Sequence, residues 1–310
     1  MNVGVIGIAG FGQHHAQAFE ELGCQVVAVA DVATSVTDWA VRFSATPYRD
    51  YRELLQHNGL QAVSVSLPPR LHPEVVRACV AQHLPVFCEK PIAPSAVEAE
   101  RLLAELGEDA PVAVGFSFRY HPAYQRLRDL MQGGTLGRIR TIDARKCWGT
   151  RTPWRLQEGG GAVFIKDIHY FDLIPWLLGE EPQQLCAFGG AFFHQAPVED
   201  SYQLLMAFRG GCVFHLDSAW WTLPTAVSHF EVVGDKARVV VEDGTLRITG
   251  EQTREETPEG EAMVRAEIRA FVDWLQGDGR RPPGLPEAVR ANRYAQQVVD
   301  ALRGRVEAGR

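Results

Sequence analysis

The spacing of hydrophobic residues along the chain changes in character near residue 120. Before that point, short apolar runs alternate with stretches of helical periodicity, the pattern expected of βαβ units. The predicted strands are Val3–Ile6, Val26–Ala30, Ala62–Ser66, Pro85–Cys88 and Val112–Gly115. The predicted helices are Gln13–Leu22, Thr37–Phe43, Tyr51–His57, His72–Gln82 and Ser95–Leu106. Continuous apolar strands are typical of a sheet covered on both faces, so residues 1–120 are predicted to form an α/β domain with a doubly wound parallel sheet.

The remainder, residues 121–310, has longer runs in which apolar and polar residues alternate. These predicted strands are Ile139–Lys146, Gln184–Phe193, Tyr202–Phe208, Val213–Trp221, Ser228–Val233 and Ala237–Val241. A strongly apolar helix is predicted at Ala162–Leu178, and further helices at Ala123–Met131, Ala262–Leu275 and Pro286–Leu302. The turn Arg209-Gly210-Gly211 is typical of a hairpin. We therefore predict a second, α+β domain with one mostly antiparallel sheet.

Composition narrows the possible partners and the compartment. The formal net charge is −7 and Lys and Arg are scattered, so no basic stripe is available to neutralise the phosphates of a nucleic acid. No apolar run reaches the roughly 20 residues of a membrane span, and no signal peptide is apparent at the start. The six cysteines form no C-x-x-C pair and the histidines no ligand cluster. These features favour a cytoplasmic protein without a metal site.

A glycine-rich turn, Gly7-Ile8-Ala9-Gly10-Phe11-Gly12, follows the first predicted strand and opens a helix. This is the context of a dinucleotide-binding Rossmann fingerprint, in which glycines allow the tight turn and the close packing of helix and strand. The middle glycine of the fingerprint is Ala9 here, and the neighbouring Gly10 could allow the backbone to approach a phosphate instead. A simple strand-to-helix turn is the alternative interpretation.

Asp31 ends the second predicted strand, about 20 residues after the turn. A carboxylate there can accept hydrogen bonds from the adenosine ribose and would repel a 2′-phosphate. The three residues that follow provide no cation to offset that repulsion. We therefore predict NAD rather than NADP, with a helix cap or loop carboxylate as the alternative role.

Glu89-Lys90-Pro91 directly follows another predicted strand, at the carboxyl edge where doubly wound sheets bind ligands. A lysine that is partly desolvated and close to a cationic nicotinamide is expected to have a lowered pKa, which suits proton exchange with a hydroxyl that becomes a carbonyl. Taken alone, however, a lysine after a strand is usually a surface charge.

Several segments together resemble the Gfo/Idh/MocA family, named after glucose–fructose oxidoreductase, inositol dehydrogenase and a rhizopine-catabolism protein. They are the glycine-rich turn with His15, Leu67-Pro68-Pro69-Arg70-Leu71-His72, Glu89-Lys90-Pro91, Arg119-Tyr120-His121-Pro122, Gly159-Gly160-Gly161 with His169 and Asp172, and Glu199-Asp200. The resemblance implies a Rossmann domain and an open-faced, mostly antiparallel sheet domain with the substrate in the cleft between them. It also implies a homodimer or homotetramer formed through that sheet.

The same resemblance implies an oxidoreductase for a sugar, cyclitol or sugar derivative, with roles for individual residues. Lys90 would position the reacting oxygen and relay its proton, with His169 as the acid/base. Pro68 and Glu89 would line the nicotinamide side.

Other residues of these motifs are weaker candidates. His72 could face the cofactor, beside Leu67 and Pro68, or could belong to a structural turn. For the substrate the candidates are Lys90, Arg119, Trp154, Arg155, His169 and Asp172. Trp154 could lie against a sugar, and Arg155 could bind a hydroxyl or carboxylate.

One position departs from the family pattern. Ile165 stands four residues before His169, where the family usually has Asp. Asp167 points to nearly the opposite side of an α-helix, whereas Asp172 lies on the correct face to orient the imidazole. Lys166 could reach the cleft, although a solvated charge is the favoured interpretation. His169 itself could also be a buried histidine satisfied by Asp172.

Three functions therefore remain open. The leading one is an NAD-dependent dehydrogenase or reductase in which Lys90 and His169 handle the proton. A redox-neutral, NAD-dependent glycosidase is the second. The third is a non-catalytic NAD or ligand sensor, which Ile165 motivates.

Overall fold

The computed structural model describes residues 1–149, 156 and 160–306, and its contacts divide them into two compact units. The first unit comprises Met1–Tyr120 and Glu261–Asn292, and the second comprises His121–Gly260 and the chain from Arg293 onward. The sequence suggested a single boundary between residues 120 and 121, but a later segment returns to the first unit. This segment returns because its apolar side chains pack in the core of the first unit. The ring centroid of Phe271 lies 6.4 Å from that of Phe19 and 5.7 Å from that of Phe87.

The first unit contains a six-stranded parallel sheet in the order β3-β2-β1-β4-β5-β6. Its strands are β1 (Asn2–Ile6), β2 (Gln25–Ala30), β3 (Thr46–Tyr48), β4 (Ala62–Val65), β5 (Val86–Cys88) and β6 (Val112–Val114). Its helices are α1 (Gln13–Glu21), α2 (Val36–Phe43), α3 (Tyr51–Leu54), α4 (His72–Ala81), α5 (Ala96–Leu106) and α9 (Met263–Gln276). This strand order is that of a Rossmann domain, as predicted. The short strand β3, which contains Pro47, was not predicted from the sequence.

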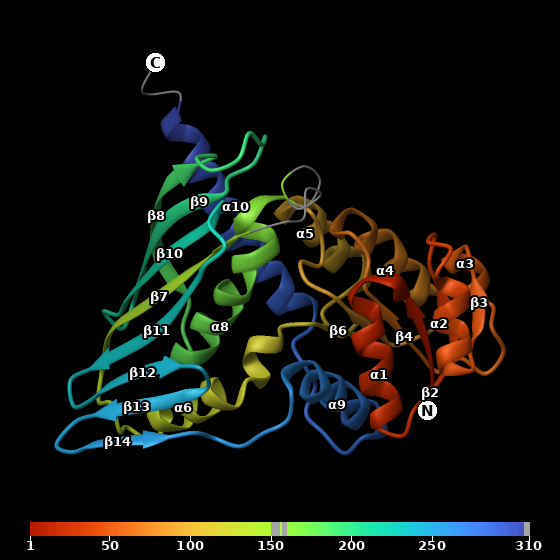
Figure 1. Cartoon of the computed structure of the whole chain (residues 1–310), viewed down its shortest axis with the longest axis horizontal. Helices are drawn as coiled ribbons and strands as arrows, with labels where there is room; N and C mark the ends of the chain where they lie inside the picture. Colours follow the sequence, from red (N-terminus) through yellow and green to blue (C-terminus); the bar gives the residue numbers. More distant parts are fainter. Residues whose placement is uncertain (150–155, 157–159, 307–310) are drawn as a thin grey trace. The chain divides into compact units, whose positions relative to one another are not determined.

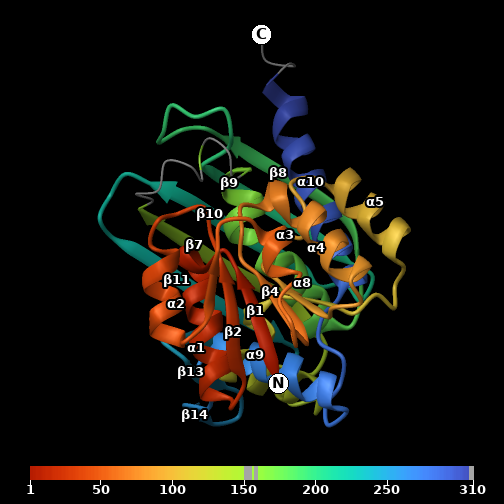
Figure 2. The same cartoon turned by 90° about the vertical axis from the view of Figure 1, so that its right-hand side faces the viewer.

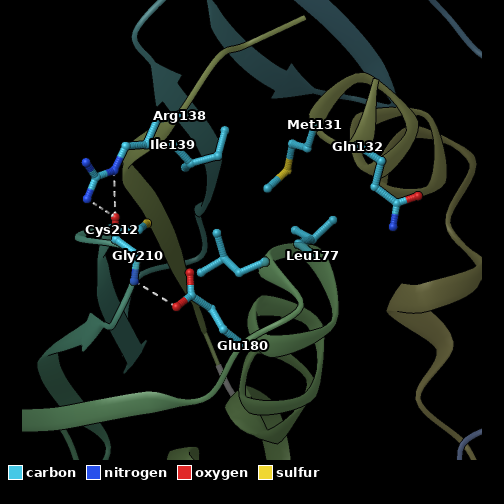
Figure 3. Close-up of a pocket in the computed structure, with 9 residues that line it drawn as sticks. Met131, Gln132, Arg138, Ile139, Leu177, Glu180, Gly210 and Cys212 are labelled. Carbon is cyan, nitrogen blue, oxygen red and sulfur yellow. Dashed lines mark hydrogen bonds between the residues drawn. The ribbon is translucent and has the colours of Figure 1, made fainter. Parts of the chain in front are cut away.

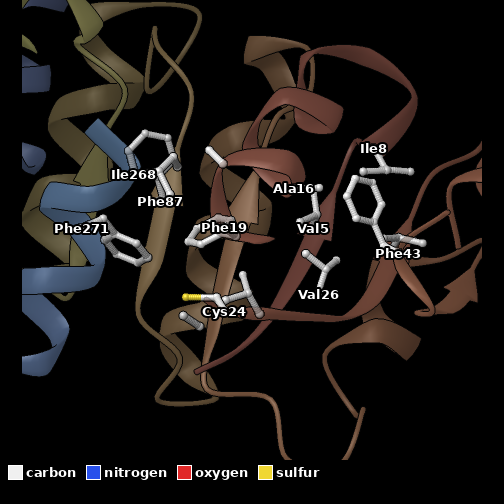
Figure 4. Close-up of a cluster of buried hydrophobic side chains, with 14 of the residues drawn as sticks. Val5, Ile8, Ala16, Phe19, Cys24, Val26, Phe43, Phe87, Ile268 and Phe271 are labelled. Carbon is white, nitrogen blue, oxygen red and sulfur yellow. The ribbon is translucent and has the colours of Figure 1, made fainter. Parts of the chain in front are cut away.

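The hydrophobic core on one face of this sheet joins helices from both ends of the chain. Phe19 of α1, Phe43 of α2 and Phe271 of α9 are buried there against Val5 and Val26 of the sheet (Figure 4). Helices α4 and α5 pack on the other face (Figure 2). The sheet is therefore covered on both sides, which explains the continuous apolar character of its strands.

The second unit contains an eight-stranded sheet in the order β14-β13-β12-β11-β7-β10-β9-β8. Its strands are β7 (Ile139–Gly149), β8 (Pro182–Gly190), β9 (Ser201–Phe208), β10 (Val213–Trp221), β11 (Ala226–Gly234), β12 (Arg238–Glu242), β13 (Thr245–Thr249) and β14 (Thr253–Glu256). Neighbouring strands are antiparallel except β7 and β10, which are parallel, so the predicted mostly antiparallel sheet is confirmed. The strands β13 and β14 were not predicted, and the four residues of β14 are all polar.

Helices cover only one face of this second sheet. Helices α6 (Pro122–Gln132) and α8 (Ile168–Leu178) lie along it, whereas none of the unit's helices within the described residues lies on the other face (Figure 1). Strand β9 shows the consequence, since Tyr202, Leu204 and Met206 are buried while Gln203 and Leu205 between them are exposed. The sheet is thus open-faced, as the resemblance implied.

The apolar helix predicted at 162–178 has two parts. A turn of π-helix, Val163–Asp167, precedes the regular α-helix α8. Side-chain directions computed for an ideal α-helix therefore do not hold for residues 163–167, and π turns are frequent at functional sites. The last helix, α10 (Leu285–Val306), begins in the first unit and ends in the second. None of the helices in the described ranges is long and apolar enough to cross a membrane.

Candidate functional site

Three segments predicted to bind the cofactor follow three neighbouring strands of the parallel sheet. The glycine-rich turn follows β1, Leu67-Pro68 follows β4, and Glu89-Lys90 follows β5. Parallel strands end at the same edge of a sheet, so these segments share the carboxyl edge, beside the point where the strand order reverses between β1 and β4. This is the position at which open α/β sheets bind their ligands.

The geometry of the glycine-rich turn explains two of its glycines. Gly7 has a φ of 87°, and a Cβ there would lie 2.0 Å from the carbonyl oxygen of Ser66. A Cβ on Gly12 would lie 2.5 Å from the carbonyl oxygen of Gly7. At Gly10, by contrast, a Cβ would meet no described atom within 4 Å. Gly7 and Gly12 are therefore required by the fold, and Gly10 lies beside open space.

Asp31 makes two backbone contacts at the turn. Its Oδ2 accepts a hydrogen bond from the amide of Ala9 and its Oδ1 one from the amide of Ala33, each 2.9 Å long. The carboxylate thus ties the end of β2 to the glycine-rich turn. This is the loop role named above as the alternative, and the predicted contact to a ribose stays a prediction.

His72 begins α4 and is fully buried. Its ring nitrogens lie 2.7 Å from the carbonyl oxygens of Pro91 and Leu67. Burial lowers the pKa of His72, and these two contacts together with the charge of Glu89 oppose that effect. His72 therefore joins the loop after β4 to the loop after β5 and, being buried, positions backbone rather than offering an exposed group.

Glu89 is held by a buried histidine. Nε2 of His15, in α1, lies 3.1 Å from Glu89 Oε1, and its Nδ1 lies 2.8 Å from Ser64 Oγ. Burial raises the pKa of Glu89, but the His15 hydrogen bond and the charges of His15, Lys90 and His72 outweigh it and lower the pKa overall. Glu89 is therefore the ionised partner of this group.

A third side chain, Glu267 of α9, joins this group. A ring nitrogen of His15 and one carboxyl oxygen each of Glu89 and Glu267 all lie within 4.8 Å of one another. Glu267 is only 1% exposed, and burial together with the charge of Glu89 raises its pKa well above the ordinary value. A role for this residue was not predicted from the sequence. Its signal was available, since Glu267 lies four positions before the core residue Phe271 and hence on the apolar face of the helix.

Lys90 is partly exposed, and its backbone amide donates a 3.2 Å hydrogen bond to Glu89 Oε2. Its charge favours the ionised forms of both Glu89 and Glu267. The predicted lysine is thus accessible and beside a group of buried titratable side chains. Pro68 is exposed at the same edge, and Arg119 is partly exposed in the turn Ser117–Tyr120 of the same unit.

In the second unit, His169 is distinguished by its exposure. Every residue from Gly161 to Pro175 is buried except His169, which is partly exposed. Asp172, one turn further along α8, is 3% exposed, and Ile165 is 9% exposed. His169 is therefore the most exposed residue of this enclosed stretch, although its Nδ1 is buried. The alternative of a histidine held by Asp172 stays a prediction.

The favoured interpretation of Lys166 as a solvated charge is wrong. The residue is 6% exposed, and its Nζ donates hydrogen bonds to the carbonyl oxygens of Lys146, at 2.8 Å, and Ala219, at 3.2 Å. It also lies over the rings of Trp148 and Trp220. The π turn directs this side chain toward the sheet.

Asp167 completes the buried network beneath the π turn. Its Oδ2 accepts hydrogen bonds from Ser218 Oγ and from Tyr202 Oη, the latter at 2.8 Å, and lies 3.8 Å from Lys166 Nζ. Each of these polar side chains thus has a partner of complementary type. The network anchors the segment that precedes His169.

Glu199 supports the start of the same segment. Its Oε1 accepts a 3.0 Å hydrogen bond from the amide of Val163, and its carbonyl oxygen accepts one from Ala162. A Cβ on Gly161, whose φ is 78°, would lie 2.2 Å from the same Oε1. Burial raises the pKa of Glu199 to about 7. The lack of a Cβ at Gly161 therefore lets this carboxyl group approach the backbone.

A pocket of about 380 Å³ lies elsewhere in the second unit (Figure 3). Its polar groups are engaged with each other, since Arg138 donates to the carbonyl oxygen of Gly210 and Glu180 accepts from the amide of Gly210. None of the predicted site residues that the structure describes lines it. The predicted substrate residues Trp154 and Arg155 lie outside the described residues.

Comparison with known proteins finds two matching family models. Residues 1–116 match the model of an oxidoreductase family with an NAD-binding Rossmann fold, and residues 124–240 match the C-terminal domain model of GFO/IDH/MocA proteins. Among curated proteins, the chain is 25% identical over 264 residues to myo-inositol 2-dehydrogenase of Thermotoga maritima, covering 81% of this chain and 79% of that protein. It is 27% identical over 324 residues to the rhizopine catabolism protein MocA of Rhizobium meliloti, and the match covers 97% of this chain and 94% of that protein.

Solved structures show the same fold. A probable dehydrogenase from Thermotoga maritima has a TM-score of 0.84 at 21% identity and covers 98% of both chains. Levoglucosan dehydrogenase, in complex with NADH and levoglucosan, has a TM-score of 0.88 at 18% identity and covers 98% of this chain and 97% of that one. The two family models, the order of the motifs and both folds agree, and the chain belongs to the Gfo/Idh/MocA family of NAD-binding oxidoreductases.

Proposed function

We propose that this protein transfers a hydride between NAD and a secondary alcohol or ketone of a sugar, cyclitol or sugar derivative, with Lys90 and His169 handling the hydroxyl proton. The observation that carries the proposal is the placement of Lys90 directly after β5, on the sheet edge that also bears the glycine-rich turn. The names of the relatives, among them a myo-inositol 2-dehydrogenase, support the substrate class.

The cofactor, when bound, accepts or donates the hydride, and the protein's own residues supply the rest. Gly7, Ala9, Gly10, Phe11 and Gly12 would hold the pyrophosphate, for which the open space at Gly10 leaves room. Leu67, Pro68 and Glu89 would line the nicotinamide side. Lys90 is accessible and charged, so it can hold the reacting oxygen and exchange its proton.

His169 is the proposed second proton-handling group. Its partial exposure on a buried helix supports this role, because an acid/base residue must reach its substrate. Asp172 would orient the imidazole in place of the carboxylate that Ile165 replaces. Arg119, Trp154 and Arg155 would contact other parts of the substrate.

The preference for NAD over NADP rests on Asp31. Its carboxylate already lies at the turn, where it accepts from the amide of Ala9. A 2′-phosphate approaching this position would meet the negative charge, whereas a ribose hydroxyl could donate to it. We expect NADH to bind more tightly than NADPH in a parallel fluorescence titration.

The proposed assembly is a homodimer or homotetramer formed through the open face of the second unit's sheet. Phe188, Leu205 and Val213 are exposed on its strands β8, β9 and β10. Large apolar side chains on an uncovered sheet face favour association of copies. The molar mass in solution tests this, and a monomer at micromolar concentration would contradict it.

The catalytic proposal is tested with a Lys90→Met variant. Turnover of NAD+ with a panel of cyclitols and sugars is expected to fall at least about 100-fold, because the proton-transfer group is removed. NADH binding, followed by nicotinamide fluorescence, is expected to change by less than about threefold. Unchanged turnover in the variant would refute the role of Lys90.

Two other outcomes would redirect the proposal. Substrate cleavage with no net change in NADH absorbance would indicate the redox-neutral glycosidase reaction. NADH binding without turnover of any panel member would favour a ligand sensor, consistent with Ile165 at the position of the usual aspartate.

A further inference from the structure

We infer that Glu267 is a neutral carboxylic acid which, with Glu89 and His15, forms a proton-sharing group beside Lys90, and that this group releases a proton when a positive charge binds next to it. No motif of the sequence analysis includes Glu267. The residue reaches the group from α9, whose sequence position is far from that of every other member.

The geometry brings two carboxyl groups close together in a buried setting. A carboxyl oxygen of Glu89, a carboxyl oxygen of Glu267 and a ring nitrogen of His15 all lie within 4.8 Å of one another. The side chain of Glu89 is 14% exposed and that of His15 fully buried, while Glu267 is 1% exposed. Two carboxylates that share a buried site cannot both ionise easily, so one of them keeps its proton.

Hydrogen bonding decides which carboxyl group is ionised. Glu89 has partners on both oxygens, His15 Nε2 at 3.1 Å and the Lys90 amide at 3.2 Å. Among the described residues, no hydrogen-bond partner is present for Glu267 Oε2. A buried anionic oxygen without a partner is far less stable than a neutral acid. The proton therefore resides on Glu267, and the negative charge on Glu89.

Within the first unit, the charged and titratable groups that act on Glu89 or Glu267, besides these two residues themselves, come from several elements. They are His15 from α1, His72 from the start of α4, Cys88 at the end of β5 and Lys90 from the loop that follows it. Lys90 is the member whose charge favours ionisation of Glu267, and the charge of Glu89 opposes it. The balance between these two charges holds the proton in place.

An added positive charge would shift this balance. The oxidised nicotinamide ring is cationic and the reduced ring is not, so only NAD+ would add such a charge. This part of the inference rests on the proposed function, which puts the nicotinamide beside Glu89 and Lys90. Binding of NAD+ would then release up to about one proton more than binding of NADH.

The proton on Glu267 can be observed without any cofactor. We would record infrared spectra of protein labelled with ¹³C at the glutamate carboxyl groups, at a pH well above 7 so that Glu199 has ionised. The wild type is expected to show the C=O band of a protonated acid, and Glu267→Gln is expected to lose it. Glu255→Gln, the same change at an exposed glutamate, should keep the band.

Three results would overturn the inference. They are the absence of the band in the wild type, its persistence in Glu267→Gln, or a stoichiometric divalent cation in the purified protein, which would occupy the place of the proton. Should Glu267→Gln fail to fold, the infrared band of the wild type, followed as a function of pH, decides alone. The band must then persist far above the ordinary range of glutamate and disappear only at high pH.

The charge-linked release is measured by calorimetry of NAD+ and NADH binding in buffers of different ionisation enthalpy. The wild type should release more protons with NAD+, and Glu267→Gln should abolish the difference. Equal proton release with both cofactors would refute this part. A protein that shows the infrared band but binds neither cofactor would refute the proposed function and leave the proton-sharing group intact.

Discussion

Each unit buries charged side chains, and the two satisfy them in different ways. In the second unit, Lys166 and Asp167 form an ion pair, in which the lysine donates to two backbone carbonyls and Oδ2 of the aspartate accepts from the hydroxyls of Tyr202 and Ser218. In the first unit, Glu267 lies beside Glu89 with one oxygen that has no described partner. A carboxylate that faces a cation and hydroxyl donors is stabilised as an anion, whereas a carboxyl group beside another carboxylate holds a proton that a nearby charge can move.

This difference corresponds to the location of the groups. The network of the second unit lies between the π turn and the sheet and anchors the segment before His169. The group of the first unit includes Glu89, which accepts a hydrogen bond from the backbone amide of Lys90. We therefore interpret the network of the second unit as structural and the group of the first unit as chemical. Substitutions can separate these two interpretations.

The largest effect is expected from Lys166→Met. The change removes the cation from a buried ion pair and leaves Asp167 without its compensating charge. Removing one partner of such a pair typically destabilises a protein by about 3–5 kcal/mol. Urea denaturation followed by tryptophan fluorescence measures the change. The control is Lys236→Met, an exposed lysine of the same unit, for which the change should stay within about 0.5 kcal/mol. A loss below about 1 kcal/mol at Lys166 would show that the network carries little stability.

A smaller, pH-dependent effect is expected from Glu199. Its pKa is about 7 in the folded protein against an ordinary value of 4.5, because burial disfavours the charged form. Between these two values the folded state holds a proton that the unfolded chain has released. The stabilisation is therefore complete below about 4.5 and is lost as the pH rises through about 7, with a total of up to about 3 kcal/mol.

The measurement is the unfolding free energy of the wild type and of Glu199→Gln across this pH range. The amide does not titrate, so the variant should lack this fall in stability. Equal slopes in the two proteins would show that Glu199 does not hold the extra proton. Glu255→Gln, which changes an exposed glutamate, provides the matched control.

Much of the first unit was predictable from local pattern. The glycine-rich turn and Glu89-Lys90-Pro91 each follow an apolar strand, and the parallel order of the sheet then places them on one edge without further information. His169 was predicted by resemblance, and its exposure emerged only from the fold. In each case the prediction came from a short motif that can be recognised along the sequence.

Contacts between distant segments could not be predicted in this way. The burial of Lys166 depends on a π turn, which the periodicity of an apolar helix does not reveal. Glu267 joins Glu89 because α9 returns to the first unit, and Asp31 reaches Ala9 across the turn. Such pairs are set by packing, which a single sequence does not specify.

The smallest destabilisation is expected from Glu267→Gln, and it compares the two units most directly. If Glu267 is already a neutral acid, an amide of the same size replaces it without loss of charge. The unfolded wild-type chain releases this proton above about pH 4.5 whereas the amide does not titrate, so the variant should not lose unfolding free energy near pH 7 and is expected to gain some. The same carboxyl-to-amide change at Asp167 removes an anion that accepts two hydroxyl hydrogen bonds and faces Lys166, and should cost about 2 kcal/mol or more. Both values come from one set of urea denaturation curves near pH 7. If Glu267→Gln destabilises the protein as much as Asp167→Asn, then Glu267 is an anion in the folded state. The first unit would then satisfy its buried charges as the second does, and the distinction between a proton-holding group and a structural network would fail.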